Sequence, residues 1–292
     1  MILITGAAGK TGKAVVKAVA AKGAKVRALV RNPDHAGALL ALGAAEISIG
    51  SFDDGRSLAR AVAGVQAIYH ICPNVSANEI AFARTVAAAA QAHGVARFVY
   101  HSVLHPQIEA MPHHWAKMRV EEMLFAEGFD LTILQPTAYM QNILGAWHGV
   151  VEDGVFRVPY PAATRLSLVD LDDVAEAAAV VLTASGHGGA TYELAGTAPL
   201  SQSDVAAAMG TALGRPVRAE EESIAVWEAR AGAGMGGQER ATLAAMFGYY
   251  AKHGLIGNPN TLRWLLGRAP NDLAAFLRRV AAAANFSAPD RA

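Results

Sequence analysis

The chain has 292 residues, 25 Lys and Arg against 25 Asp and Glu, and a single cysteine, Cys72. This balance of charge argues against nucleic acid or an anionic membrane as partner, because both select a basic surface. One cysteine excludes an internal disulfide and a four-cysteine zinc site. No apolar run is long enough to span a bilayer and no signal-like segment precedes the first predicted strand, so we expect a cytoplasmic protein.

Short β-branched segments alternate with alanine-rich helical segments through the first half of the chain, which is typical of βαβ units and a parallel sheet. The predicted strands are residues 2–5, 25–30, 46–49, 67–71, 97–101 and 131–135. The predicted helices are residues 10–22, 34–42, 54–62, 80–93 and 112–127, each followed closely by a glycine that suits a helix C-cap. We therefore predict an α/β fold with a Rossmann-like, doubly wound parallel sheet over residues 1–136.

The regular alternation ends after Pro136. Residues 164–196 are expected to return to the sheet with a helix (172–184) and a strand (191–196). Residues 137–163 and 197–292 are expected to form a smaller C-terminal α+β substrate lobe and a helical tail. Within this lobe the sequence predicts a capping box at Ser201 and Asp204, a flexible connection or lid at GAGMGG (232–237), and a closing helix (272–284).

The stretch TGAAGKTG, residues 5–12, lies between the first predicted strand and helix. A P-loop needs a glycine five positions before Gly9, and Ile4 occupies that position, so the triphosphate interpretation fails. Gly6, Gly9 and Gly12 instead suit a dinucleotide turn that directs helix N-terminal amides at a pyrophosphate. The alternative is that these glycines make only a tight corner.

The end of the second predicted strand indicates which dinucleotide would bind. Arg31 lies there in LVRN, where a carboxylate would favour a bare 2'-hydroxyl and an arginine favours a 2'-phosphate. This predicts NADP(H), unless Arg31 is only a solvated side chain. Phe52 and Asp53, in GSFDD after the third strand, are candidates to flank the adenine, although Asp53 or Asp54 could equally cap the next helix.

Seven segments follow one another in an order that resembles the NmrA-like branch of the atypical short-chain dehydrogenases/reductases: TGAAGKTG, VRN, SFDD, VARFVYHS, HHWAKMRVEEML, LQPTAYMQNI and LVDLDDVA. The resemblance covers roughly residues 1–210. It implies an NADP(H)-preferring Rossmann domain with a small C-terminal lobe, in proteins that are either reductases or cofactor-sensing regulators. It also implies a set of cofactor contacts: Gly6, Ala8, Gly9, Lys10, Thr11 and Gly12 at the pyrophosphate, Arg31 at the 2'-phosphate, and Pro136 and Lys117 farther along.

The same resemblance directs attention to the segment HHWAK. Many short-chain reductases place a tyrosine four residues before a lysine that faces the nicotinamide, and here His113 stands four residues before Lys117. We expect Lys117 to anchor the nicotinamide ribose and His113, with an ordinary pKa near ~6.5, to donate the proton; alternatively, His113 is a surface residue. Ser102, at the end of the fifth strand, is the third catalytic candidate.

The segment after the sixth strand is expected to line the substrate. By the family pattern Tyr139, Met140 and Asn142 form part of the wall, and Trp147 adds an aromatic group, although ordinary packing would explain them as well. A metal site among the histidines near residues 101–114 is not expected, because the one-turn spacing with an intervening glutamate and a thiolate partner are both missing.

Two function classes remain open on the sequence. The first is an NADPH-dependent reductase of a small uncharged, aromatic or quinone-like carbonyl, enone or imine. Quinones would suit a site without the tyrosine because they need little acid assistance. The second is a non-catalytic NADP(H) sensor that docks to a protein partner; a sugar-nucleotide epimerase suits the sequence less well, because it would need the absent tyrosine. The sequence leaves self-association open.

Overall fold

The computed structural model describes residues 1–286, and residues 287–292, the end of the expected helical tail, lie outside the described part. Contacts between Cα atoms divide the chain into two units. The first comprises residues 1–136 and 171–194, and the second comprises residues 137–170 and 195–292. Each unit is described by itself.

The first unit contains a seven-stranded sheet in the order β3-β2-β1-β4-β5-β6-β11. All neighbouring strands pair in parallel. The strands are β1 (Ile2–Ile4), β2 (Val26–Val30), β3 (Glu46–Ile49), β4 (Ala67–His70), β5 (Arg97–His101), β6 (Asp130–Pro136) and β11 (Ala190–Leu194). This is the doubly wound, Rossmann-like arrangement that the alternating pattern predicts.

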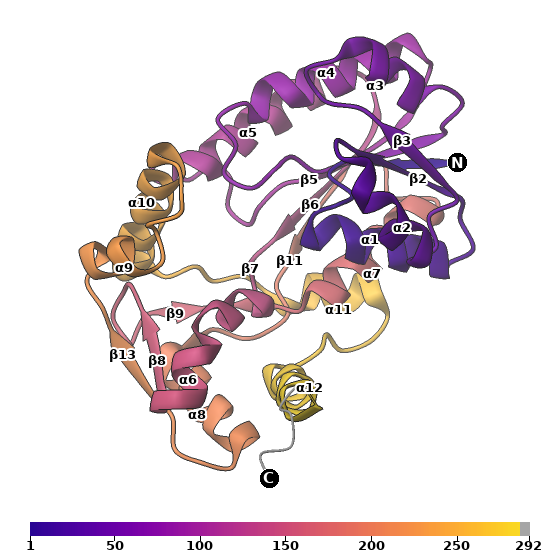
Figure 1. Ribbon diagram of the computed structural model, residues 1–292. Helices are drawn as coiled ribbons and strands as arrows, with labels where there is room; N and C mark the ends of the chain where they lie inside the picture. Colours follow the sequence, from indigo (N-terminus) through magenta and orange to yellow (C-terminus); the bar gives the residue numbers. More distant parts are fainter. Residues whose placement is uncertain (287–292) are drawn as a thin grey trace. The chain divides into compact units, whose positions relative to one another are not determined.

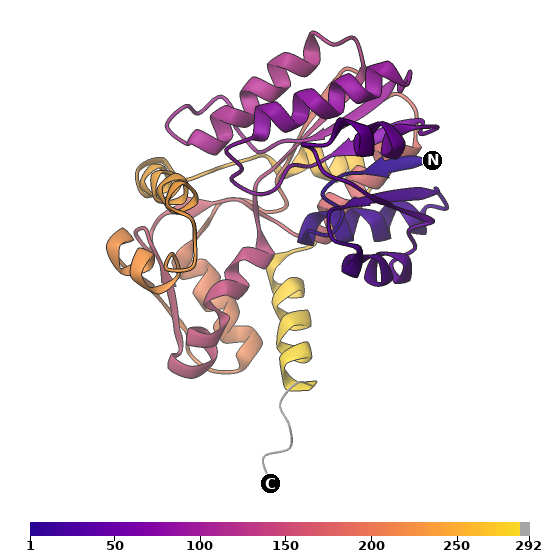
Figure 2. The same ribbon diagram turned by 45° about the horizontal axis from the view of Figure 1, so that its top comes forward.

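Helices cover both faces of this sheet (Figures 1 and 2). They are α1 (Lys10–Ala21), α2 (Ala36–Ala41), α3 (Gly55–Val62), α4 (Glu79–Ala92), α5 (Pro112–Phe125) and α7 (Leu171–Thr183). One face packs α1 against α7, and the other packs α4 between α3 and α5. Buried strand residues such as Ile68, Phe98 and Ile133 meet Val86 of α4 and Leu124 of α5, so burial on both faces explains the nearly continuous apolar strands.

The predicted elements differ from the structure at two places. The helix expected over 34–42 begins as a 3₁₀ turn, η1 (Pro33–His35), because Asn32 accepts a hydrogen bond from the Asp34 amide and Pro33 starts the turn. The strand predicted over 67–71 is one residue shorter, since β4 ends at His70, and Cys72 lies buried in the following loop. Burial and the nearby Glu79 carboxylate raise the pKa of this thiol well above its usual value, so it is an inert thiol.

The second unit is built from short strands and helices. Its strands are β7 (Ala138–Tyr139), β8 (Val155–Val158), β9 (Arg165–Leu166), β10 (Leu168–Val169), β12 (Leu200–Ser201) and β13 (Arg218–Glu221), paired as β7 with β10, β9 with β12 and β8 with β13. Its helices are η2 (Met140–Ala146), α6 (Trp147–Asp153), α8 (Gln202–Leu213), α9 (Ile224–Arg230), α10 (Gly237–His253), α11 (Pro259–Leu266) and α12 (Leu273–Phe286). The predicted capping box is confirmed, since Ser201 and Asp204 each bond the other's backbone amide at the start of α8.

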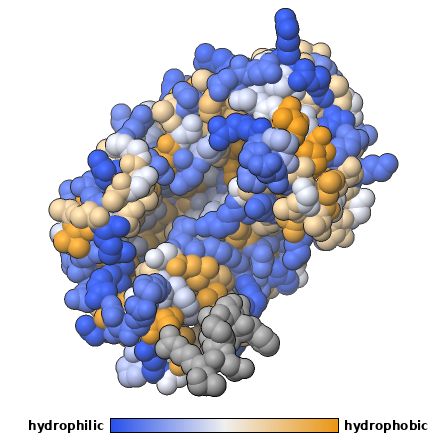
Figure 3. All heavy atoms as spheres, viewed as in Figure 1, coloured by the Kyte–Doolittle hydropathy of each residue, from blue (hydrophilic) through white to orange (hydrophobic). Residues whose placement is uncertain are grey.

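Large apolar side chains that reach solvent are scattered through both units. Leu40, Ile49 and Phe125 are exposed in the first unit, and Trp264 is exposed in the second. On the face shown in Figure 3, apolar residues form small groups separated by hydrophilic ones. Among the described residues, no helix is long and apolar enough to cross a membrane.

Gly6 and Gly12 make the turn after β1 possible. Gly6 has a φ of +57°, a conformation that side chains disfavour, and a Cβ there would lie 2.8 Å from the Ile71 carbonyl oxygen. A Cβ on Gly12 would lie 2.3 Å from the Gly6 carbonyl oxygen and 2.7 Å from Ala7 Cα. The turn folds so tightly onto the first turn of α1 that only glycine fits at these two positions.

Three histidines of this unit are almost completely buried. His70 and His114 are fully buried, and His101 is 5% exposed. Burial lowers the pKa of His70 to about 4 and those of His101 and His114 to about 3. These imidazoles are therefore neutral in the folded protein at pH 7.

We expect Gly12→Ala to destabilise the cofactor-free protein by about 3 kcal/mol, because its methyl group would overlap backbone that cannot move away. The free energy of unfolding in urea measures this. Gly55→Ala is the matched control, since it also lies in the first turn of a helix but a Cβ there meets no atom within 4 Å. An equal loss in both variants would contradict the close approach.

We expect His70 to make the protein less stable as pH falls from about 6.5 toward 4. Its pKa is near ~6.5 when unfolded and about 4 when folded, so the unfolded chain binds the extra proton in this range and gains stability from it. For this residue alone the loss between pH 7 and pH 5 is about 2 kcal/mol. His70→Asn should remove that part of the pH dependence of the unfolding free energy, whereas the same substitution at exposed His35 should leave it unchanged.

Candidate active site

The turn at residues 5–12 leaves the N-terminus of α1 open to a ligand. Gly9 is the N-cap residue, and no side chain caps the helix there. Outside its own neighbours and helix, a Cβ on Gly9 would meet within 4 Å only the Gly6 carbonyl oxygen, at 3.3 Å, so no distant segment crowds this glycine. An uncapped helix N-terminus beside a glycine turn suits a pyrophosphate, and partial burial lowers the pKa of the adjacent Lys10. The turn therefore fits the dinucleotide that the sequence predicts.

The order of the strands determines which strand ends lie beside this turn. The chain leaves β1 toward β2 and β3 on one side and later returns to β4 and β5 on the other, so the topological switch point lies between β1 and β4. Dinucleotides bind across such a point at the carboxyl ends of the strands. Thr5 connects the ends of β1 and β4. Its hydroxyl forms a hydrogen bond with His70 Nδ1 at 3.0 Å and accepts a hydrogen bond from the Ile71 amide at 3.0 Å.

On the β2 and β3 side, Arg31 and Asp53 are exposed as a cofactor contact requires. Arg31 directly follows β2. Phe52 does not suit the expected stacking on adenine, because only 9% of the residue is exposed and its ring packs on Phe82 and His70. Asp54, and not Asp53, caps α3 by accepting the Arg56 amide at 3.0 Å. Of the Phe52 and Asp53 pair, Asp53 alone has an accessible side chain.

On the β4 and β5 side, Lys117 lies at the centre of a buried polar cluster. Its ammonium donates to Glu79 Oε1 at 2.9 Å and to the His101 carbonyl oxygen at 3.1 Å. Tyr100 donates to the same Glu79 oxygen at 2.8 Å, and the Lys117 ammonium lies 5.3 Å from the centre of the Tyr100 ring. Only 15% of the Lys117 side chain is exposed, so the ammonium is held in a largely buried position.

Ser102 belongs to a second cluster one helical turn farther along α5. Its hydroxyl donates to Glu121, whose two carboxylate oxygens also accept from Gln135 at 2.9 and 3.0 Å. Burial raises the pKa of Glu121, and these hydrogen bonds and the charge of Lys117 oppose that rise. Ser102 is only 2% exposed, so its hydroxyl serves first to join β5 to α5.

His113 lies near Lys117, as expected, but does not suit the role of an imidazolium acid. Burial, followed by the charge of Lys117, lowers the pKa of His113 to about 4. At pH 7 the ring is therefore neutral and has no second proton to give. Its Nδ1 atom is buried without a hydrogen-bond partner in the described part of the chain, and its ring packs edge-on against His114.

Sequence reasoning missed the acidic members of both clusters. Glu121 follows Lys117 by four residues on a predicted helix, so the shared face was a usable signal. Glu79 precedes the helix predicted from residue 80, where a carboxylate could have been taken only as a helix-start residue. Tyr100 and His70 lie within apolar strands, and nothing in the sequence distinguishes them from core aromatic residues.

The residues expected at the substrate wall all belong to the second unit. Tyr139 is half-buried and Asn142 is exposed, whereas Met140 is fully buried and its side chain only fills the interior of that unit. Trp147 Nε1 is buried and has no hydrogen-bond partner among the described residues. Between these positions, Gln141 Nε2 donates to the buried carboxylate of Asp170 at 2.7 Å.

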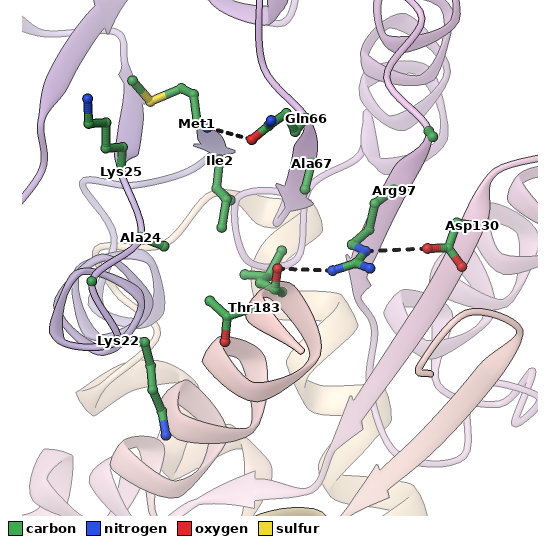
Figure 4. A pocket seen from close by; sticks show the side chains of 13 residues that line it. Met1, Ile2, Lys22, Ala24, Lys25, Gln66, Ala67, Arg97, Asp130 and Thr183 are labelled. Carbon is green, nitrogen blue, oxygen red and sulfur yellow. Dashed lines mark hydrogen bonds and ion pairs between the residues drawn. The ribbon is translucent and has the colours of Figure 1, made fainter. Parts of the chain in front are cut away.

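A separate depression of about 560 Å³ lies at the opposite, amino edge of the sheet in the first unit (Figure 4). Arg97 there pairs with Asp130 at 3.3 Å and donates to the carbonyl oxygens of Leu182 and Ala184 at the end of α7. The Arg97 guanidinium therefore satisfies carbonyl oxygens at a helix C-terminus, as expected where helices end. In residues 1–286 no group of three or more His, Cys, Asp or Glu side chains is arranged to hold a metal ion.

Proteins of known activity resemble this chain over nearly its whole length. NAD(P)H azoreductase of Xenophilus azovorans is 28% identical over 286 residues, which are 97% of this chain and 99% of the relative. Quinone oxidoreductase 2 of Escherichia coli is 30% identical over 277 residues, which are 94% of this chain and 96% of the relative. The crystal structure of the Escherichia coli NADPH-dependent quinone oxidoreductase complexed with NADPH superimposes with a TM-score of 0.85 at 29% identity, over 96% of this chain and 99% of that one.

The sequence model of the NmrA-like family matches residues 1–277, which include the glycine turn, Arg31, Lys117 and the segment after β6. That match confirms the resemblance in the order of the seven segments, and the parallel sheet of the first unit agrees with it. The chain belongs to the NmrA-like family.

Proposed function

We propose that this member of the NmrA-like family is an NADPH-dependent oxidoreductase that reduces quinones or similar electron-poor aromatic carbonyl compounds. The observation that carries the proposal is the glycine turn at an uncapped helix N-terminus beside the switch point, with Lys117 held on the β4 and β5 side. Relatives that span almost the whole chain are reductases that use NADPH or NAD(P)H. The cofactor is NADP(H).

Each half of the cofactor has residues of this chain to hold it. The amides at the start of α1 face the pyrophosphate, and Arg31 after β2 offers a planar pair of donors to a 2'-phosphate. On the other side of the switch point, Lys117 uses two of its three N–H groups on Glu79 and His101. The remaining N–H group would bind the nicotinamide ribose. When bound, the reduced nicotinamide supplies the hydride.

The state of His113 favours an acceptor that needs no strong acid. A neutral imidazole donates a hydrogen bond but is a weak proton donor, and the tyrosine of many short-chain reductases is replaced here by His113. Quinones accept hydride to give a stabilised phenolate, which water can protonate. Azo compounds, the substrates named for the azoreductase relative, are the next class to test.

We expect Arg31→Ala to weaken NADPH binding by about 2 kcal/mol, roughly thirtyfold in Kd, and to leave NADH binding nearly unchanged, because only NADPH carries the 2'-phosphate. Fluorescence titration of both cofactors measures this. Arg60→Ala, which removes an exposed arginine from the last turn of α3, is the matched control. Equal losses for NADPH and NADH would overturn the assignment of Arg31.

We expect NADPH oxidation, followed by absorbance, to be fastest with quinones in a panel that also contains azo dyes, enones, aryl ketones and imines. Because the His113 ring is already neutral, His113→Asn should keep quinone turnover within about threefold, whereas loss of a proton donor would cost about 100-fold or more. Turnover of aryl ketones alone would argue against the quinone class. Tight NADPH binding with no turnover of any acceptor would instead indicate a cofactor sensor.

A further inference from the structure

Glu79 is the buried carboxylate partner of Lys117. The residue is 4% exposed, and one carboxylate oxygen accepts from both Lys117 Nζ and the Tyr100 hydroxyl. Tyr100 is itself fully buried, and the ring of His70 stacks on it with centres 6.0 Å apart. Through these hydrogen bonds Glu79, the first residue of α4, is joined to Tyr100 near the end of β5 and to Lys117 in the middle of α5.

Several features keep this carboxylate ionised. Burial alone would raise the pKa of Glu79, but the charge of Lys117 and the hydrogen bonds from Lys117 and Tyr100 together leave it lowered. As the first residue of α4, it also lies at the positive end of a helix dipole. The His70 ring beside it is neutral, since the pKa of His70 is about 4. A negative and a positive charge therefore face each other with a net charge near zero.

This balance matters because of where the pair lies. Lys117 contacts the carbonyl of His101, the last residue of β5, and Glu79 begins the helix that follows β4. Under the proposed function this side of the switch point takes the nicotinamide half of the cofactor. Oxidised and reduced nicotinamide differ by one positive charge, so the net charge of the neighbouring pair acts differently on the two forms.

We propose that Glu79 is a charge-compensating and positioning residue that acts through Lys117 and sets the relative affinity of the protein for NADP⁺ and NADPH. Glu79 cancels the field of the Lys117 ammonium and fixes the direction of its remaining N–H group. Without the carboxylate, an uncompensated buried ammonium disfavours the positively charged oxidised ring. Without the lysine, an uncompensated carboxylate favours it.

The test is the ratio of Kd for NADP⁺ to Kd for NADPH, measured by calorimetric titration of purified variants. We expect Glu79→Gln to raise this ratio about fivefold and Lys117→Met to lower it about fivefold, the size of one charge acting across a partly buried site. The double variant should return close to the wild-type ratio, because its net charge is again near zero. Glu79→Gln keeps an amide oxygen that can accept from Tyr100, so the fold has a means to persist.

Glu122→Gln is the matched control, since it removes an exposed carboxylate from α5, the helix that carries Lys117, and it should leave the ratio unchanged. A purely structural role for Glu79 would weaken both cofactors equally, and that result would overturn the proposal. If Glu79→Gln does not fold, Lys117→Met still decides the matter by the sign of its shift. A wild-type protein that binds neither cofactor would refute the proposed function itself, whereas intact binding with unchanged ratios would refute only this inference.

Discussion

The parallel pairing of β1 with both β2 and β4 is the constraint on which the first unit depends. Because the chain leaves β1 in one direction and returns on its other side, the loops after β1 and β4 diverge and leave their carboxyl ends open between them. The glycine turn, Thr5 and the neutral ring of His70 all meet at this point. The candidate contacts at the glycine turn, Arg31 and Asp53 follow strand ends or start a helix, whereas Lys117 reaches this edge from within α5.

The polar clusters at the ends of β4 and β5 show how the fold tolerates charge away from water. An isolated buried carboxylate or ammonium is costly, and removing one partner from a buried pair costs more than the pair itself contributes. Here Glu79 has Lys117 and Tyr100, while Glu121 has only the neutral donors Ser102 and Gln135. The two carboxylates thus differ in their pKa, lowered for Glu79, which pairs with Lys117 of α5, and raised for Glu121, which belongs to α5. Lys117 donates a hydrogen bond directly to Glu79, whereas it acts on Glu121 only through its charge, which explains the difference.

The turn after β1 was predictable because it depends on local sequence. A glycine turn acts within a few residues of the chain, so Gly6 and Gly12 could be identified from their neighbours. The sequence left the helix cap open between Asp53 and Asp54, and the role of Arg31 stays a prediction. The chemistry of His113 could not be identified in this way. The sequence shows that His113 stands four residues before Lys117, but the pKa of His113 depends on burial. Burial is produced by side chains that are far away in the sequence.

The sequence by itself determined the alternation of strands and helices, the parallel sheet, the turn after β1 and the family. These follow from periodicity, glycine positions and the order of short segments, which are properties of the chain alone. Only the tertiary structure decided that Phe52 and Met140 are packing residues. It also decided that Glu79 pairs with Lys117, 38 positions away, and that the Ser102 hydroxyl donates to Glu121. Burial and ionic pairing depend on residues that folding brings together, and a linear sequence does not state which residues those are.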